Sequence, residues 1–172
     1  VSLNFSRLDF ELMDVCDVLE EYVNKYNINK DYLHIEITES ALSENFELLS
    51  KSIGRIKKLG YTVWLDDFGS GYSSLNVLKD YEFNVIKIDM KFLSNFEENS
   101  KSKDIIETII ELSNKLGMKT LTEGVETLKQ AEYLKQIGCG RLQGYLFGKP
   151  FKLEDFEKNI ENKEFIVSKE IL

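Results

Sequence analysis

Residues 63–75 read VWLDDFGSGYSSL, and the interpretation of the whole chain starts from this stretch. A short apolar strand, Tyr61 to Leu65, leads into two adjacent carboxylates, Asp66 and Asp67, and then into Phe68-Gly69-Ser70-Gly71 and a serine-rich helix start. Two like charges side by side are tolerated when a cation neutralises them or when one takes up a proton. The pair is therefore a candidate anchor for a divalent metal ion. The alternative is a solvated Asp-Asp turn that caps the next helix.

The composition describes one globular domain with an acidic balance. The chain has 172 residues, of which 42% are hydrophobic and one is proline, so it is long enough to bury a full core. Its net charge is −8, with basic residues scattered among acidic ones, so binding to duplex nucleic acid is not expected.

Cysteine usage and hydropathy bear on location. Cys16 and Cys139 lie far apart and have no metal-type spacing, which fits a reducing compartment and makes the cytoplasm the default location. No apolar run approaches the roughly 20 residues that span a bilayer. The chain starts at Val1 rather than Met, which suggests a fragment or a processed chain whose parent could carry a membrane anchor that is not visible here.

Strand-like and helical patterns alternate along the chain. Strands are expected at 1–5, 33–38, 61–65, 84–89, 118–122 and 141–147, and helices at 9–26, 44–59, 74–79, from Ser102 to about Leu116, and at 127–137 and 153–160. Three helices close on a similar signal, namely Lys58-Leu59-Gly60, Lys115-Leu116-Gly117 and Gln136-Ile137-Gly138. A recurring βα unit of this kind predicts a mainly parallel sheet.

Polar side chains occur on or after all six predicted strands: Asn4, Glu36, Asp66, Asp67, Lys87, Glu123 and Gln143. A (β/α) barrel collects such side chains at the carboxyl ends of its strands. A doubly wound open sheet would gather its ligand groups at one switch point instead. The distribution over every strand favours the barrel.

The candidate ligands are all oxygen donors. Glu36, Asp66, Asp67 and Glu123 supply carboxylates and Asn4 an amide, a set that suits Mg²⁺ or Mn²⁺ rather than zinc. Two such ions are the usual apparatus for in-line phosphoryl displacement, and a lysine such as Lys87 on the same rim would orient the attacking water or neutralise developing charge. Taken singly, each residue also has a structural interpretation, such as a helix-entry acid or a solvated lysine on an edge strand.

The chain resembles the EAL-domain cyclic di-GMP phosphodiesterases. The motifs that carry the resemblance run in the family's order through nearly the whole chain: VSLNFS (1–6), HIEITES (34–40), WLDDFGSGYSSL (64–75), NVIKIDMKF (84–92), LTEGVET (121–127) and GCGRLQGYLFGKP (138–150). The resemblance implies a modified TIM barrel that binds two Mg²⁺ or Mn²⁺ ions and hydrolyses one phosphodiester of cyclic di-GMP to the linear dinucleotide.

The resemblance also implies roles for individual residues. Asn4, Glu36 and Asp66 would hold one metal ion, and Asp66, Asp67 and Glu123 the second. Lys87 would contact the attacking water, while Glu123 has an alternative role as general base. Gln143 would contact the site, and the segment from Tyr145 to Pro150 would line the guanine pocket.

A regulatory loop is implied as well. It would run from Phe68 through Gly69, Ser70, Gly71 and Tyr72 to Ser74 and couple the metal site to dimerisation. Glu39 and Glu126 would help to fix its conformation.

The sequence departs from the family at its start. The Glu-Ala-Leu motif with its nearby arginine is absent, so one metal ligand is missing, and about six strands are present where a closed (β/α)8 barrel needs eight. We therefore expect an N-terminally truncated single domain over 1–172 with little hydrolytic activity, and self-association through exposed sheet edges. Ser70 and Gly140 are milder departures.

Two alternatives remain at this point. The chain could be a degenerate domain that binds cyclic di-GMP or a protein partner without turnover, as the missing motif would allow. It could also be an unrelated metal-dependent barrel that acts on a carboxylate substrate, which the series of motifs disfavours.

Overall fold

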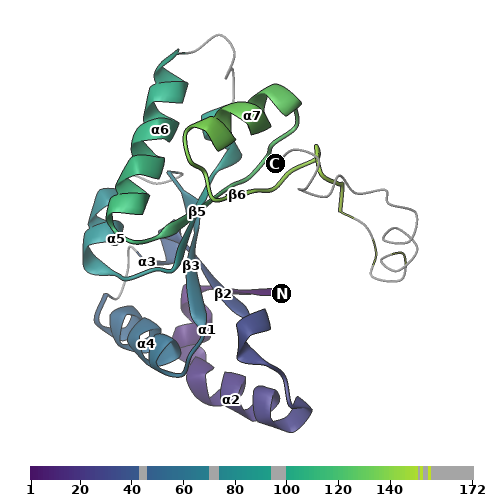
Figure 1. Ribbon diagram of the computed structural model, residues 1–172. Coiled ribbons are helices and arrows are strands. Elements are labelled where there is room, and N and C mark those ends of the chain that lie inside the picture. The colour runs from purple at the N-terminus through teal and green to yellow at the C-terminus, as the bar shows by residue number, and fades with distance from the viewer. Residues whose placement is uncertain (43–45, 70–73, 94–99, 151, 153–154, 156–172) are drawn as a thin grey trace. The chain divides into compact units, whose positions relative to one another are not determined.

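The computed structural model describes residues 1–42, 46–69, 74–93, 100–150, 152 and 155 (Figure 1). The chain divides into two compact units, one formed by Val1–Ile88 with Gly117–Lys119 and the other by Asp89–Leu116 with Thr120–Leu172. Part of the predicted regulatory loop lies outside the described residues, namely Ser70, Gly71 and Tyr72. Most of the helix predicted at 153–160 also lies outside them. No helix in the described part of the chain is long and apolar enough to cross a membrane.

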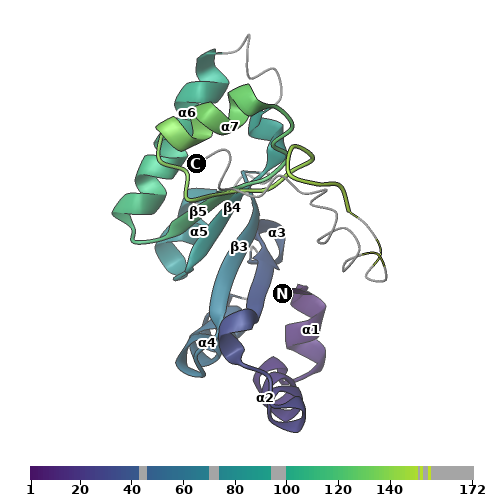
Figure 2. The ribbon, with the colours of Figure 1, turned by 45° about the vertical axis from the view of Figure 1, so that its right-hand side comes forward.

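The described strands follow one another in chain order in one sheet. They are β1 (Ser2–Phe5), β2 (His34–Thr38), β3 (Thr62–Phe68), β4 (Val85–Ile88), β5 (Lys119–Thr122) and β6 (Arg141–Leu142). β3 of the first unit and β5 of the second are labelled in both views (Figures 1 and 2). β1 to β4 pair in parallel, as do β5 and β6. An unbroken chain order is the order of a TIM-barrel-like fold and not of a doubly wound sheet, so the predicted class is confirmed.

Along the chain, helical segments alternate with the strands, as the βα pattern predicts. In the first unit they are α1 (Arg7–Leu12), α2 (Val15–Tyr26), the 3-10 helix η1 (Lys30–Tyr32), α3 (Glu39–Leu42), α4 (Phe46–Lys58) and α5 (Ser74–Asp80). In the second they are η2 (Met90–Leu93), α6 (Ser100–Lys115) and α7 (Leu128–Gln136). A glycine follows each of α4, α6 and α7, and its backbone is left-handed in every case, which confirms the predicted helix ends. The φ angles are +94° at Gly60, +76° at Gly117 and +82° at Gly138.

The single helix predicted over 9–26 is wrong, because two helices occupy this range. α1 ends at Leu12, and Met13 has an extended backbone. Asp14 then caps α2 by accepting a hydrogen bond from the Asp17 amide at 3.2 Å. The apolar spacing continues across the break, so periodicity alone does not reveal it, whereas an N-cap aspartate followed by apolar residues does.

The core of the first unit follows from the period-two alternation of its strands. Ile35 and Ile37 of β2 are fully buried, as are Val63 and Leu65 of β3. α4 packs on β3 and contributes buried side chains such as Ile53 and Ile56. Burying each of these aliphatic side chains contributes about 1.5–3 kcal/mol. Because one face of the strands is committed to this core, the charged residues at alternate positions lie on the other face.

The strand predicted at 141–147 is shorter than expected. β6 ends at Leu142, and the following backbone instead bonds to the segment after β5: Gln143 O accepts from Val125 N at 3.0 Å, and Leu146 N donates to Val125 O at 3.0 Å. Gly144, with φ of +159°, lies so close that an added Cβ would overlap the Val125 carbonyl and amide. Only glycine permits this approach.

Substitution of Gly144 should therefore be costly. We expect Gly144→Ala to reduce the free energy of unfolding by about 1–3 kcal/mol, because the backbone of Val125 must move. Gly54→Ala is the matched control, since Gly54 lies inside α4 with no atom within 4 Å of its added Cβ. The control should stabilise the chain by up to about 1 kcal/mol through helix propensity. Urea unfolding of both variants measures the difference, and equal midpoints would contradict this account.

Candidate functional site

Asp66 and Asp67 lie in a β-bulge. Leu65 pairs with Ile86 and Phe68 with Ile88, so two residues of β3 face the single residue Lys87 of β4. The prediction that β3 ends at Leu65 is thus wrong, because the strand continues through the carboxylates to Phe68. A bulge bends a strand and re-aims its side chains.

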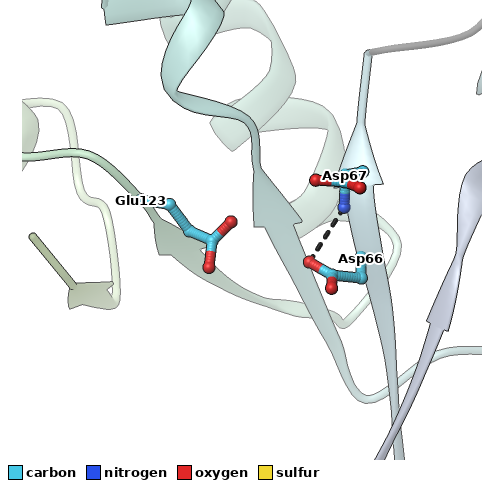
Figure 3. Close-up of side chains that lie close together, drawn as sticks. All are labelled: Asp66, Asp67 and Glu123. Atoms are coloured by element: carbon cyan, nitrogen blue, oxygen red, sulfur yellow. Dashed lines mark hydrogen bonds between the residues drawn. The ribbon is translucent and has the colours of Figure 1, made fainter. Parts of the chain in front are cut away.

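The backbone within the bulge brings the two aspartates together. Asp67 has a left-handed backbone with φ of +55°, which aspartate tolerates better than most residues. Its amide donates to Asp66 Oδ1 at 2.9 Å (Figure 3). Asp66 is half-buried and Asp67 is exposed, so the two neighbouring carboxylates differ in their access to solvent.

Lys87 lies between two carboxylates of neighbouring strands. Its Nζ is 2.8 Å from Asp66 Oδ1 and 3.0 Å from Glu36 Oε2, and the three side chains are 7%, 13% and 6% exposed. Lys87 is therefore buried, and the alternative interpretation of it as a solvated lysine on an edge strand is wrong. Buried charges of this kind persist only when they are paired, and this cluster pairs one cation with two anions.

Asn4 joins this group through the sheet register. Asn4 of β1 is the register partner of Glu36 of β2. Paired residues of neighbouring strands project from the same face, so the Asn4 side chain is on the face that carries Glu36. The residue is exposed.

An aromatic pair occupies the preceding positions on this face. His34 stacks on Trp64 with ring centroids 4.4 Å apart and planes at 17°, and its Nδ1 is 2.7 Å from Thr62 Oγ1. These rings precede Glu36 and Asp66 by two residues, which places them one step along the same face. The His34 ring is therefore engaged both in aromatic packing and in a polar contact with the neighbouring strand.

Glu39 contacts the start of the predicted regulatory loop. It is 2% exposed, and its Oε2 accepts from the Gly69 amide at 2.9 Å. Phe68, the preceding residue, is buried. A buried carboxylate that accepts a backbone N–H fixes the chain directly after β3.

Glu123 and Gln143 occupy strand ends in the second unit. Glu123 follows β5 directly and is half-buried (Figure 3). Gln143 follows β6, and its amide donates to Thr122 O at 2.9 Å while its own side chain is exposed. Both residues thus directly follow the carboxyl ends of their strands.

The other predicted residues of the second unit are more exposed. Tyr145 is 58% exposed, with Lys149 Nζ 5.5 Å from its ring centroid, and Pro150 is exposed. Glu126 is also exposed, and its amide donates to Gln130 Oε1 at 2.8 Å in the cap of α7. The described contacts of Glu126 thus belong to the start of α7.

Sequence reasoning passed over Asp89, a buried carboxylate directly after β4. It is 7% exposed, accepts from the Lys91 amide at 2.8 Å and lies 3.1 Å from Lys91 Nζ. The signal that would have found it is the one that selects Glu123, an acid immediately after a parallel strand.

The donor chemistry suits a hard divalent cation. Glu36 and Asp66 offer carboxylate oxygens on one face, and Asn4 adds an amide oxygen. His34, the one histidine in the sequence, is engaged in its stack with Trp64. Oxygen-only sites favour Mg²⁺, Mn²⁺ or Ca²⁺.

The fold and site define a class: TIM-barrel-like α/β proteins with acidic oxygen donors at the carboxyl ends of parallel strands. The EAL domain family matches residues 1–150 of this chain, so the chain belongs to the EAL domain family.

Characterised relatives agree with this assignment. Cyclic di-GMP phosphodiesterase PdeR of Escherichia coli is 32% identical over 92% of this chain and 24% of its own length. Among solved structures, the EAL enzyme Bd1971 in its cAMP- and cyclic-di-GMP-bound form has a TM-score of 0.87 and 31% identity over 92% of this chain and 42% of that one. BlrP1 of Klebsiella pneumoniae, in a manganese and cyclic-di-GMP complex, has a TM-score of 0.81 and 26% identity over 87% and 38%. The chain thus spans about a quarter of PdeR and less than half of these solved chains.

Removal of the Glu39 carboxylate should loosen the chain after β3. In Glu39→Ala the Gly69 amide loses its acceptor, and we expect its hydrogen exchange to accelerate by about tenfold, the equivalent of one such bond. Ser40→Ala is the control, because Ser40 is exposed and bonds to Thr38 Oγ1 at 3.1 Å. Exchange measured by NMR at Gly69 tests this, and unchanged protection in Glu39→Ala would show that the bond does not hold the loop.

Proposed function

We propose that this EAL domain hydrolyses one phosphodiester of cyclic di-GMP to the linear dinucleotide, using divalent cations. The observation that carries the proposal is the buried cluster of Glu36, Lys87 and Asp66 on one face of the sheet. A cluster of this composition is costly to bury, and buried ionisable clusters are concentrated at functional sites. The similarity to the cyclic di-GMP phosphodiesterase PdeR and to the cyclic-di-GMP-bound EAL enzyme Bd1971 supports cyclic di-GMP as the substrate.

We assign the ions to the residues as follows. Asn4, Glu36 and Asp66 would hold one Mg²⁺ or Mn²⁺ ion, and Asp66 would bridge to a second. Asp67 and Glu123 would complete the second site with Asp66, since three such carboxylates could hold an ion together. Bound ions would polarise the phosphoryl oxygens and lower the pKa of a bound water.

The remaining side chains act on the nucleotide and the water. The ammonium of Lys87 would orient the attacking water or stabilise charge on the phosphorus oxygens. Glu123 has a second possible role as general base. Gln143, Tyr145 and Pro150 would contact the nucleotide, for which the exposed Tyr145 ring offers a stacking surface.

We also propose a second copy of this chain as a partner. β1 ends the sheet in the described part of the chain, with Ser2 and Asn4 exposed. Its outer edge offers unpaired backbone groups to another strand. Light scattering tests this, and a monomer at all concentrations would contradict it.

We place the protein in the cytoplasm, since Cys16 and Cys139 are free thiols.

The test of function is chromatography of cyclic di-GMP after incubation with Mn²⁺, with EDTA as the metal-free control. A polypeptide extended upstream of Val1 to include a Glu-Ala-Leu segment should make the linear dinucleotide, and the present chain should make little. Asp66→Asn in the extended polypeptide should slow turnover by at least about a hundredfold, since Asp66 serves both ions.

Two results would overturn this proposal. Turnover that persists in EDTA would remove the metal ions from the mechanism. Retention of cyclic di-GMP by both polypeptides with no product from either would identify a receptor without turnover, and the metal roles given above would then be withdrawn.

A further inference from the structure

We propose that Lys87 is an internal counter-ion that competes with the divalent cation for Glu36 and Asp66. Its ammonium holds the two carboxylates together until a cation takes their oxygens. The inference rests on the proposed function only in taking these carboxylates as metal ligands, and it does not require that cyclic di-GMP be hydrolysed.

The contacts of Lys87 carry the argument. Its Nζ lies 2.8 Å from Asp66 Oδ1 and 3.0 Å from Glu36 Oε2, which are ion-pair distances to both side chains. Glu36 and Asp66 come from neighbouring strands, β2 and β3, and Lys87 comes from β4. One ammonium therefore bridges the carboxylates of two strands, and a cation that used these oxygens would have to share or displace it.

Burial makes this bridge matter energetically. The three side chains are 7%, 6% and 13% exposed, so water screens the repulsion of the carboxylates poorly. Removing one partner from a buried ion cluster is costly because the remaining charges lose their compensation. Lys87 should thus stabilise the metal-free protein and weaken cation binding at the same time.

Lys57 offers a matched lysine outside the site. Its Nζ is 2.8 Å from Glu82 Oε2, as close as Lys87 is to Asp66, but the Glu82 side chain is 89% exposed. An exposed pair of this kind contributes little, because solvent already screens both charges. Lys57→Met removes one lysine charge and an ion pair of the same length, and it leaves Glu36 and Asp66 unchanged.

The experiment compares the wild-type chain, Lys87→Met and Lys57→Met. Mn²⁺ affinity is measured by calorimetry and by the fluorescence of Trp64, the single tryptophan in the sequence, which precedes Asp66 by two residues. Thermal unfolding of each protein is followed without metal and with saturating Mn²⁺. We expect Lys87→Met to lower the metal-free Tm and to tighten Mn²⁺ binding by about tenfold or more. Its Mn²⁺-induced rise in Tm should exceed that of the wild type, since ligand stabilisation grows with affinity.

Each outcome decides the inference. Weaker or unchanged Mn²⁺ binding in Lys87→Met would overturn it, as would an equal gain in Lys57→Met, which would show a general charge effect. Absence of Mn²⁺ binding in both the wild type and Lys87→Met would overturn it too. Tighter binding in Lys87→Met together with no hydrolysis of cyclic di-GMP by any extended polypeptide would uphold the counter-ion role and remove the proposed function.

Discussion

The ammonium of Lys87 between the carboxylates of Glu36 and Asp66 is the interaction on which the site depends. Three neighbouring strands each place one charged side chain on the face opposite the aliphatic core, because alternate positions are taken by residues such as Ile35, Val63 and Ile86. Without a cation, two acids on adjacent strands would repel each other in a poorly screened environment. Lys87 resolves that repulsion within the protein.

The β-bulge adds a second carboxylate without moving the strand out of the sheet. A regular strand would send Asp66 and Asp67 to opposite faces. With two residues of β3 facing Lys87 and Asp67 in a left-handed conformation, Phe68 returns to register with Ile88 and to the core. Glu39 then holds the chain immediately after the bulge through the Gly69 amide. The sheet thus keeps its apolar packing while the strand end gains an exposed acid.

Much of the fold could be predicted from the sequence, because it follows from local patterns. Period-two alternation marks β2 and β4, and a glycine at each helix end marks the start of the next βα unit. Periodicity does not predict the break at Asp14, because the apolar spacing of α1 and α2 runs through it. After β6, the backbone of Val125, which is distant in sequence, donates to Gln143 O and accepts from Leu146 N, an arrangement that the local sequence does not reveal.

The candidate site residues can be picked out from the sequence, whereas their geometry cannot. Acids and amides at strand ends are visible in the sequence, and Asp89 could have been found by the same rule. The left-handed backbone of Asp67 was not visible, since aspartate occurs in many conformations. The burial of Lys87 also depends on its neighbours in β2 and β3, and a lysine in an alternating strand reads more simply as a solvated residue.

The most direct test of the account is anomalous diffraction from crystals of this chain grown with Mn²⁺. The account predicts a manganese peak within about 2.0–2.6 Å of carboxylate oxygens of both Asp66 and Glu36, with Lys87 moved away from at least one of them. A cluster that keeps both Lys87 contacts, with manganese found only at exposed surface acids, would contradict it.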